Sequence, residues 1–132
     1  MNSPNTLTAT AIVALGGGVG AMLRYHAGRA VTAFSGPNTL FPWGTFLINV
    51  SGSLLMGLLA GWLARQDGSE SLRLLLGVGV LGGFTTFSAF SLETAMLMQR
   101  GLYGMAGFYA LGSLLGGVAG LFLGLSMMRG AA

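Results

Sequence analysis

The sequence has no cysteine and no lysine, and its 132 residues include only one histidine and three acidic residues. Without cysteine it can form neither disulfides nor thiolate metal sites. One histidine and three carboxylates are too few for an ordinary His/Asp/Glu metal cluster or a hydrolytic triad within one chain. The glycine-rich stretch at 16–20 lies in too apolar a setting for a phosphate-binding loop. The sequence therefore predicts that the protein is not an enzyme.

Charged residues make up 7% of the chain, whereas a soluble domain has about 25%. Hydrophobic residues make up 53%, and the mean hydropathy is +0.76. A membrane-crossing helix needs about 20 predominantly apolar residues. We therefore expect an all-α protein of the cell inner (plasma) membrane, in which residues 1–132 form a single four-helix transmembrane domain. Its spans are predicted at 8–30, 43–64, 72–99 and 102–128, the first as a retained helix because no basic residue precedes it.

The six arginines are scattered near the ends of the predicted spans, which fits anchoring in a lipid bilayer better than nucleic-acid binding. Four spans place both termini on one side, with three arginines toward each side. The positive-inside rule then gives no preferred orientation. Such a chain could insert both ways up, and two opposite copies could pair as an antiparallel homodimer. This inference of dual topology depends on counting Arg24, which lies within an apolar stretch.

Small residues recur every four positions on two of the predicted spans. One stripe runs through Gly112, Gly116, Gly120 and Gly124, and the other through Ser53, Gly57 and Gly61. Such stripes let helix backbones approach closely in lipid. The sequence leaves open whether they pack within one chain or between two chains.

The third span contains two glycines followed by alternating hydroxyls and phenylalanines, GGFTTFSAFS at 82–91. Glycine weakens a helix, so we predict that the third helix is broken near 82–85. Polar, irregular backbone at membrane depth is tolerated where it packs against protein or lines a wet cavity. A break would free backbone carbonyls, which suit a hard cation such as sodium. Paired glycines can also serve only packing or a kink.

Phe87 and Phe90 are three residues apart and share one side of a helix, with Thr86 and Ser88 among them. The edge of an aromatic ring carries partial positive charge. Ring edges and hydroxyls could attract an anion without holding it too tightly for release. The alternative is a buried aromatic pair.

Asn49 and Thr45 are four residues apart on the second span and share a helix face. Asn49 could make an interhelical hydrogen bond or present an amide donor to an anion. Glu93 lies close to the helical stripe of Thr86 and Phe90, and an acid at membrane depth indicates function. A pairing of Glu93 with an arginine or a hydroxyl is equally consistent with the sequence.

Tyr109 and Ser113 are four residues apart on the last span and could form a hydroxyl pair that passes an ion along. Tyr109 could instead belong to an interfacial aromatic belt with Tyr103 and Phe108. Arg24 could extend to the headgroups, or it could draw anions into a vestibule.

Three stretches resemble the signature of the Fluc/CrcB fluoride channels: GGGVGAMLRY at 16–25, PWGT at 42–45 together with Asn49, and GGFTTFS at 82–88. They occur in matching order, and the resemblance covers roughly 16–126. It implies a dual-topology homodimer with two antiparallel pores that export fluoride passively. It also implies a central structural sodium ion held by backbone carbonyls of both subunits, which correspond here to Gly82 and Thr85.

On this basis the predicted pore combines ring edges, hydroxyls, an amide and two charged side chains. Its residues are Phe87, Phe90, Asn49, Thr45, Thr86, Ser88, Tyr109, Ser113, Arg24 and Glu93. Two positions depart from the family pattern. Ala89 stands where the family often has threonine, and Gly117 stands where some members continue the polar track with serine.

The residues by themselves predict a narrow anion pathway, and only the resemblance names fluoride. An alternative is a small dual-topology, proton-coupled exporter of organic cations, which needs a membrane-embedded carboxylate. Glu93 is the only candidate for that role. A third possibility is an assembly subunit that transports nothing.

Overall fold

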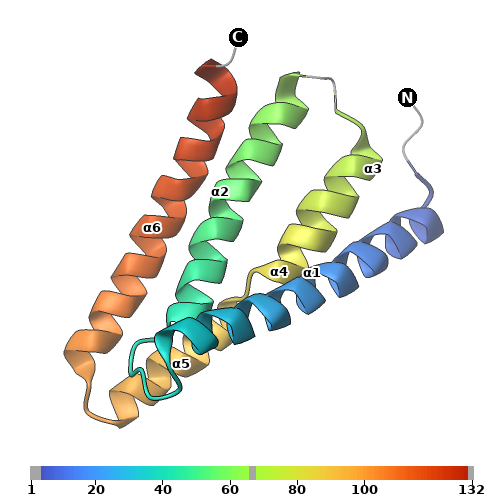
Figure 1. Ribbon diagram of the computed structural model, residues 1–132. Coiled ribbons are helices and arrows are strands. Elements are labelled where there is room, and N and C mark those ends of the chain that lie inside the picture. Colours follow the sequence, from blue (N-terminus) through green and yellow to red (C-terminus); the bar gives the residue numbers. More distant parts are fainter. Residues whose placement is uncertain (1–3, 66–67, 131–132) are drawn as a thin grey trace.

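The computed structural model describes residues 4–65 and 68–130, and this part of the chain is helical with no β-strand (Figure 1). The elements in chain order are α1 (Thr6–Ser35), α2 (Trp43–Arg65), α3 (Glu70–Leu72), the π-helix η1 (Arg73–Leu81), α4 (Gly82–Phe84), α5 (Phe87–Gln99) and α6 (Tyr103–Gly130). Four stretches are long and apolar enough to cross a membrane, namely Thr6–Ser35, Trp43–Arg65, Glu70–Gln99 and Tyr103–Arg129. The prediction of an all-helical protein with four membrane-spanning stretches is confirmed.

The chain connections alternate between the two ends of the bundle. The end of α2 and the end of α6 lie together at one end, and the connections α1–α2 and α5–α6 lie at the other (Figure 1). Helix α1 continues to Ser35, beyond the predicted end at residue 30. It stops where Gly36 takes φ +87°, a conformation that favours glycine, and the Gly36 N–H donates to the Thr32 carbonyl over 2.9 Å.

Helices α2 and α6 pack along most of their length through the predicted small-residue stripes. A Cβ atom added to Gly57 would meet the backbone carbonyl of Leu121, and one added to Gly124 would meet that of Leu54. These glycines therefore pack within a single chain, which answers the question that the sequence left open.

Helix α1 crosses η1 and α4 at a second glycine contact. Gly16 lies against Gly79, and Gly83 lies against the backbone of Gly17. A Cβ atom on Gly20 would meet the carbonyl of Val80. The glycine-rich stretch at 16–20 thus serves a close helix crossing, in agreement with the rejection of a phosphate-binding loop.

The third spanning stretch changes conformation four times, from α-helix to π-helix, back to α-helix, to an extended segment and again to α-helix. Residues 73–81 form the π-helix η1, and α4 ends at Phe84 because Thr85 turns to an extended conformation (φ −77°, ψ 157°). Thr86 is also extended (φ −149°, ψ 120°), and its side chain accepts a hydrogen bond from the Ala89 N–H at the start of α5. Gly82 lies within α4, so the non-helical residues are the two threonines that follow the glycine pair.

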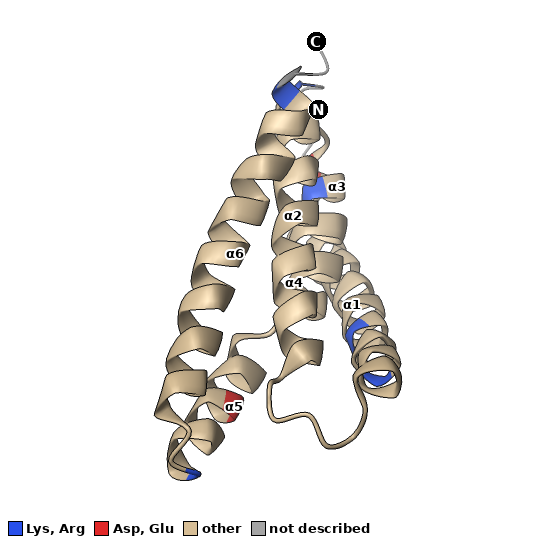
Figure 2. Ribbon diagram, turned by 60° about the vertical axis from the view of Figure 1, so that its left-hand side comes forward, with Lys and Arg blue, Asp and Glu red and all other residues tan. Residues whose placement is uncertain are grey.

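The described chain is open rather than compact. Its accessible surface is 8170 Å², whereas a soluble monomer of 13.5 kDa exposes about 6,500 Å². The largest fully buried side chain is Tyr109, which belongs to a small cluster with Leu97 and Ala106. Helix α5 packs mainly against α6, and charged residues are few along the bundle (Figure 2). Such an apolar, open surface is suited to lipid or to a second chain.

Candidate functional site

Two cavities lie near the extended threonines. The larger, which we call the vestibule, has a volume of about 810 Å³ and lies between α1, the 36–42 connection, the first turn of α2 and α5. The smaller, which we call the inner cleft, has a volume of about 300 Å³. The inner cleft is lined by Asn49, Ser53, Thr85, Thr86, Phe87, Phe90, Ser113 and Leu114. Thr86 lines both cavities, so they meet at this residue.

Asn49 of α2 holds the extended segment in place. Its Nδ2 donates to the Thr86 carbonyl over 2.9 Å, and its Oδ1 accepts from the Thr86 N–H over 2.8 Å. The amide therefore supplies both backbone partners that Thr86 would otherwise lack. Nδ2 carries a second hydrogen, and Asn49 also lines the inner cleft. The structure thus shows the interhelical hydrogen bond and leaves one amide donor for the cleft.

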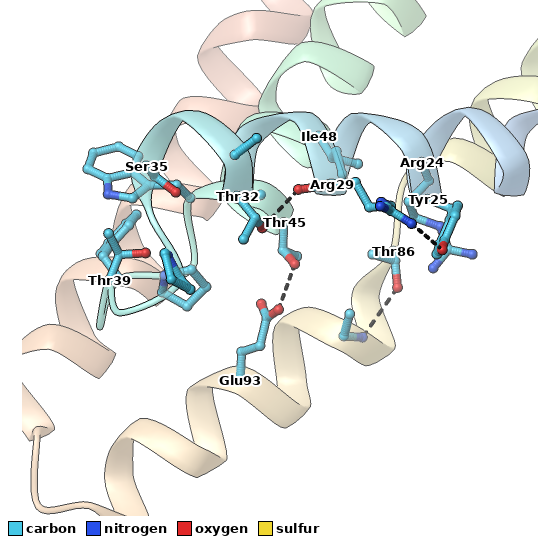
Figure 3. A pocket seen from close by; sticks show the side chains of 18 of the residues that line it. Arg24, Tyr25, Arg29, Thr32, Ser35, Thr39, Thr45, Ile48, Thr86 and Glu93 are labelled. Carbon is cyan, nitrogen blue, oxygen red and sulfur yellow. Dashed lines mark hydrogen bonds between the residues drawn. The ribbon is translucent and has the colours of Figure 1, made fainter.

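Glu93 of α5 is bound by two hydroxyls. Its Oε1 accepts from Thr45 Oγ1 over 2.8 Å, and its Oε2 accepts from the Tyr109 hydroxyl over 2.7 Å. Figure 3 shows Glu93 and Thr45 pointing toward one another. Of the partners that the sequence allowed, the carboxylate pairs with hydroxyls and not with an arginine. These bonds join α2, α5 and α6 at the wall of the vestibule.

Tyr109 is fully buried, so it does not lie in an interfacial belt, whereas Tyr103 and Phe108 are exposed. Its ring is 5.5 Å from that of Phe41 and 5.2 Å from that of Phe90, measured between centroids. This packing explains why its hydroxyl reaches inward to Glu93.

The two predicted pore phenylalanines both line the inner cleft. Their ring centroids are 5.6 Å apart, with the planes inclined by 42°. Phe90 is partly buried against Tyr109, but Phe87 is 79% exposed. A large exposed ring beside a polar cleft indicates a surface that another chain or lipid covers.

Each cavity contains a donor that the described residues leave without a partner. Ser113 Oγ in the inner cleft and Arg24 Nε in the vestibule are both shut off from solvent and make no hydrogen bond. Buried polar groups are normally paired, so each needs an explanation. The described part of the chain supplies no acceptor for either group.

The N-terminus of α5 lies where the two cavities meet. Thr86 Oγ1 accepts from the Ala89 N–H over 3.2 Å and is 3.3 Å from Ser88 Oγ. The first N–H groups of a helix have no intrahelical acceptor and carry the positive end of the helix dipole. The junction at Thr86 is therefore electropositive without a charged side chain.

The structure brings most of the predicted pore residues to these cavities. Five line the inner cleft (Asn49, Thr86, Phe87, Phe90 and Ser113), and Arg24, Thr45 and Glu93 line the vestibule with Thr86. Tyr109 lies beneath Glu93, and Ser88 lines neither cavity.

Ser53, which the sequence placed only in a packing stripe, lines the inner cleft, and Arg29, for which no site role was predicted, lines the vestibule. Ser53 lies four residues after Asn49 and donates to its carbonyl over 2.8 Å, so helical spacing could have found it. A Cβ atom at Gly117 would lie 3.3 Å from Ser53 Oγ, so Ser53 supplies a hydroxyl next to Gly117. Ala89 lines the vestibule without a hydroxyl.

Comparison with known proteins identifies the family. A family model described as "CrcB-like protein, Camphor Resistance (CrcB)" matches residues 11–125. The chain belongs to the CrcB family. Together with the four apolar helices, this membership makes it a multi-pass membrane protein, which in bacteria means the plasma membrane.

Three relatives show how close the match is. A protein of Novosphingobium aromaticivorans named fluoride-specific ion channel FluC is 74% identical over 126 residues, which cover 96% of this chain and all of the relative. Proteins with the same name from Rhodopseudomonas palustris and Caulobacter vibrioides are 52% and 51% identical over 89% of this chain, and over 94% and 93% of their own lengths.

Proposed function

We propose that the chain is a passive, fluoride-selective channel that exports fluoride across the plasma membrane. The observation that carries the proposal is a pair of cavities that meet at Thr86, each with a buried donor that has no partner among the described residues. The naming of the relatives as fluoride-specific channels supports fluoride as the ion.

In this proposal, Arg24 draws the anion into the vestibule, and the ion enters the inner cleft at Thr86. There it exchanges water for the helix N-terminus of α5, the free Asn49 N–H and the Ser113 hydroxyl, with the edges of Phe87 and Phe90 beside it. Fluoride is strongly hydrated, so several donors in succession are needed to replace its water. No arginine lines the inner cleft, and the absence of a full charge among its lining residues favours rapid release.

The working unit we propose is an antiparallel, dual-topology homodimer with two pores. The exposed ring of Phe87 and the large open surface of the single chain support a second subunit at this face. The balance of three arginines toward each side of the membrane supports insertion in both orientations. A reporter fused to the C-terminus should give signals from both compartments, and a signal from only one would contradict dual topology.

We also propose that Gly82 and Thr85 hold a structural sodium ion at the dimer centre through their backbone carbonyls. Backbone carbonyl oxygens are suitable ligands for sodium. Because α4 ends at Phe84, the carbonyls of its last turn receive no hydrogen bond from an N–H group within the helix. The Leu81 carbonyl is an exception, since it accepts from Thr85 N and Oγ1 over 3.0 and 2.9 Å. Gly82 is exposed in the single chain, which leaves room for a second subunit beside it. Sodium would supply positive charge that joins the two subunits.

The proton-coupled exporter has less support than the channel. An exporter of that kind would require Glu93 to alternate between a proton and a cationic substrate, whereas here two hydroxyl donors hold both carboxylate oxygens. The family assignment also favours the channel. A passive channel needs no catalytic group.

The test is fluoride efflux from liposomes that contain the purified protein, recorded with a fluoride electrode in phosphate-free buffer. We expect rapid fluoride efflux and little chloride efflux from parallel vesicles. Fluoride efflux no faster than from protein-free vesicles would contradict the proposal, and equal rates for the two halides would contradict its selectivity.

A further inference from the structure

The vestibule is far larger than a single halide ion requires, at about 810 Å³ against about 300 Å³ for the inner cleft. Three charged side chains line it, namely Arg24, Arg29 and Glu93. Two guanidinium groups against one carboxylate leave the vestibule with excess positive charge, and that carboxylate already accepts hydrogen bonds from Thr45 and Tyr109.

The two arginines that could bind an oxyanion differ in burial and in hydrogen bonding. Arg24 has a buried Nε without a partner among the described residues. Arg29 is exposed, and its NH1 donates to the Tyr25 hydroxyl over 3.2 Å while its guanidinium lies 5.8 Å from the centre of the Tyr25 ring. Figure 3 shows Arg24, Tyr25 and Arg29 on the α1 wall, with Glu93 on the α5 wall. Tyr25 thus limits the freedom of Arg29 while most of its N–H groups remain available.

Further donors come from the opposite side of the vestibule. Helix α2 begins at Trp43, and in its first turn the N–H groups of Trp43 and Phe46 donate to the carbonyls of Phe41 and Pro42 over 2.9 and 3.1 Å. The N–H groups of Gly44 and Thr45, which line the cavity, have no intrahelical acceptor. The hydroxyls of Thr32 and Thr39 add no donor, because they already donate to the carbonyls of Gly28 and Gly36 over 3.0 and 3.3 Å. A guanidinium fork, a second guanidinium and a helix N-terminus match an anion with several oxygens better than a monatomic one.

We propose that the vestibule binds a phosphate group through Arg24 and Arg29, as free inorganic phosphate or as the headgroup of an anionic phospholipid. Trp43 lines the vestibule and is partly exposed, as expected of a tryptophan at the level of lipid headgroups. The inference rests on the proposed function in one respect, because a phosphate held there occupies the entrance that fluoride uses. Phosphate would therefore compete with fluoride entry.

Binding of inorganic phosphate is tested by equilibrium dialysis of the purified protein against radiolabelled phosphate, without fluoride. We expect saturable binding that Arg29→Gln weakens by at least about tenfold, since a charge-assisted hydrogen bond is lost. Arg24→Gln should weaken it similarly. The matched control is Arg100→Gln, because Arg100 follows α5, is exposed and lines neither cavity. It should bind phosphate as the unaltered protein does.

The phospholipid source is tested by native mass spectrometry of the same proteins purified with phosphatidic acid and phosphatidylcholine. Phosphatidic acid retained by the unaltered protein and by Arg100→Gln, but lost from Arg29→Gln, would support the lipid source. Dialysis binding with the same pattern would support free phosphate. The inference is overturned if the unaltered protein binds neither, or if Arg100→Gln weakens binding as much as Arg29→Gln.

The outcome is separable from that of the channel proposal, because binding is measured without fluoride. Fluoride efflux without phosphate binding would refute only the phosphate site. Phosphate binding without fluoride efflux would refute only the channel. If both hold, added phosphate should slow efflux through the unaltered protein more than through Arg29→Gln, each relative to its own phosphate-free rate.

Discussion

Two regions of this chain bring helices together in opposite ways. Where α1 crosses η1 and α4, glycine lies on glycine and the backbones themselves are in contact. Around α5 the chain is open, since the vestibule separates α5 from α1 and the ring of Phe87 is 79% exposed. Polar groups there are positioned by side-chain hydrogen bonds and not by close packing. All the contacts of the crossing lie within one chain, whereas the exposed surface of the α5 region is suited to contact with a partner chain.

The largest effect is expected at the crossing. Gly20→Leu places a side chain where a Cβ atom already meets the Val80 carbonyl, and the backbones cannot separate without losing the whole contact. We expect no recoverable folded protein, measured as the monodisperse peak in gel filtration. The control is Gly18→Ala, because nothing lies within 4 Å of its added Cβ and alanine favours a helix. A normal yield from Gly20→Leu would show that the crossing is not a tight contact.

The second effect is expected in the open region, where substitutions should reduce fluoride efflux without changing the assembly of the protein. Phe87→Ile and Phe90→Ile remove the ring edges from the inner cleft while keeping apolar bulk. We expect fluoride efflux to fall to the level of protein-free vesicles, with an unchanged gel-filtration profile. Phe34→Ile is the matched control, because Phe34 is 94% exposed and lines neither cavity. Unchanged efflux in both variants would remove the phenylalanines from the mechanism.

The third effect is expected on both thermal stability and fluoride efflux. Asn49→Ala removes two hydrogen bonds to the Thr86 backbone, which costs about 2 kcal/mol at about 1 kcal/mol each. We expect a lower thermal midpoint together with reduced fluoride efflux, because the junction of the cavities is no longer held. Ser53→Ala removes only a bond within α2 and should change the midpoint little. A normal midpoint for Asn49→Ala would show that the extended segment is held by other contacts.

The sequence was sufficient to predict the four membrane-spanning stretches, because the length and hydropathy of a stretch depend only on its own residues. Three residues that the family resemblance assigned to a pore, Asn49, Phe90 and Ser113, do line one cleft. The sequence could not locate the extended residues, because Thr86 is held by Asn49 from 37 positions away. Likewise, the spacing of Tyr109 and Ser113 allowed two positions for Tyr109. Its burial depends on Phe41, a residue of the connection before α2 that no periodic pattern marks.

A smaller effect is expected from Glu93→Gln. The Thr45 and Tyr109 hydroxyls can bond to an amide by reorienting, so the change replaces two charge-assisted bonds with two neutral ones. We expect efflux to fall by a few-fold, on the order of the 1 kcal/mol that separates such bonds. Uptake of an organic cation, measured on the same variant, also tests the exporter hypothesis. A proton-coupled exporter would lose all transport when Glu93 becomes Gln.

The smallest effect is expected from Ser113→Ala, and it distinguishes the two regions most sharply. The buried hydroxyl of Ser113 has no partner among the described residues, so its removal breaks no hydrogen bond within the chain. Since an unsatisfied buried group is unfavourable, the thermal midpoint should stay the same or rise slightly. Efflux should nevertheless fall by a few-fold, because the inner cleft loses a donor that compensates for the ion's lost water. A lower midpoint would mean that the hydroxyl bonds within the assembled protein and serves structure, and unchanged efflux would place it outside the fluoride pathway.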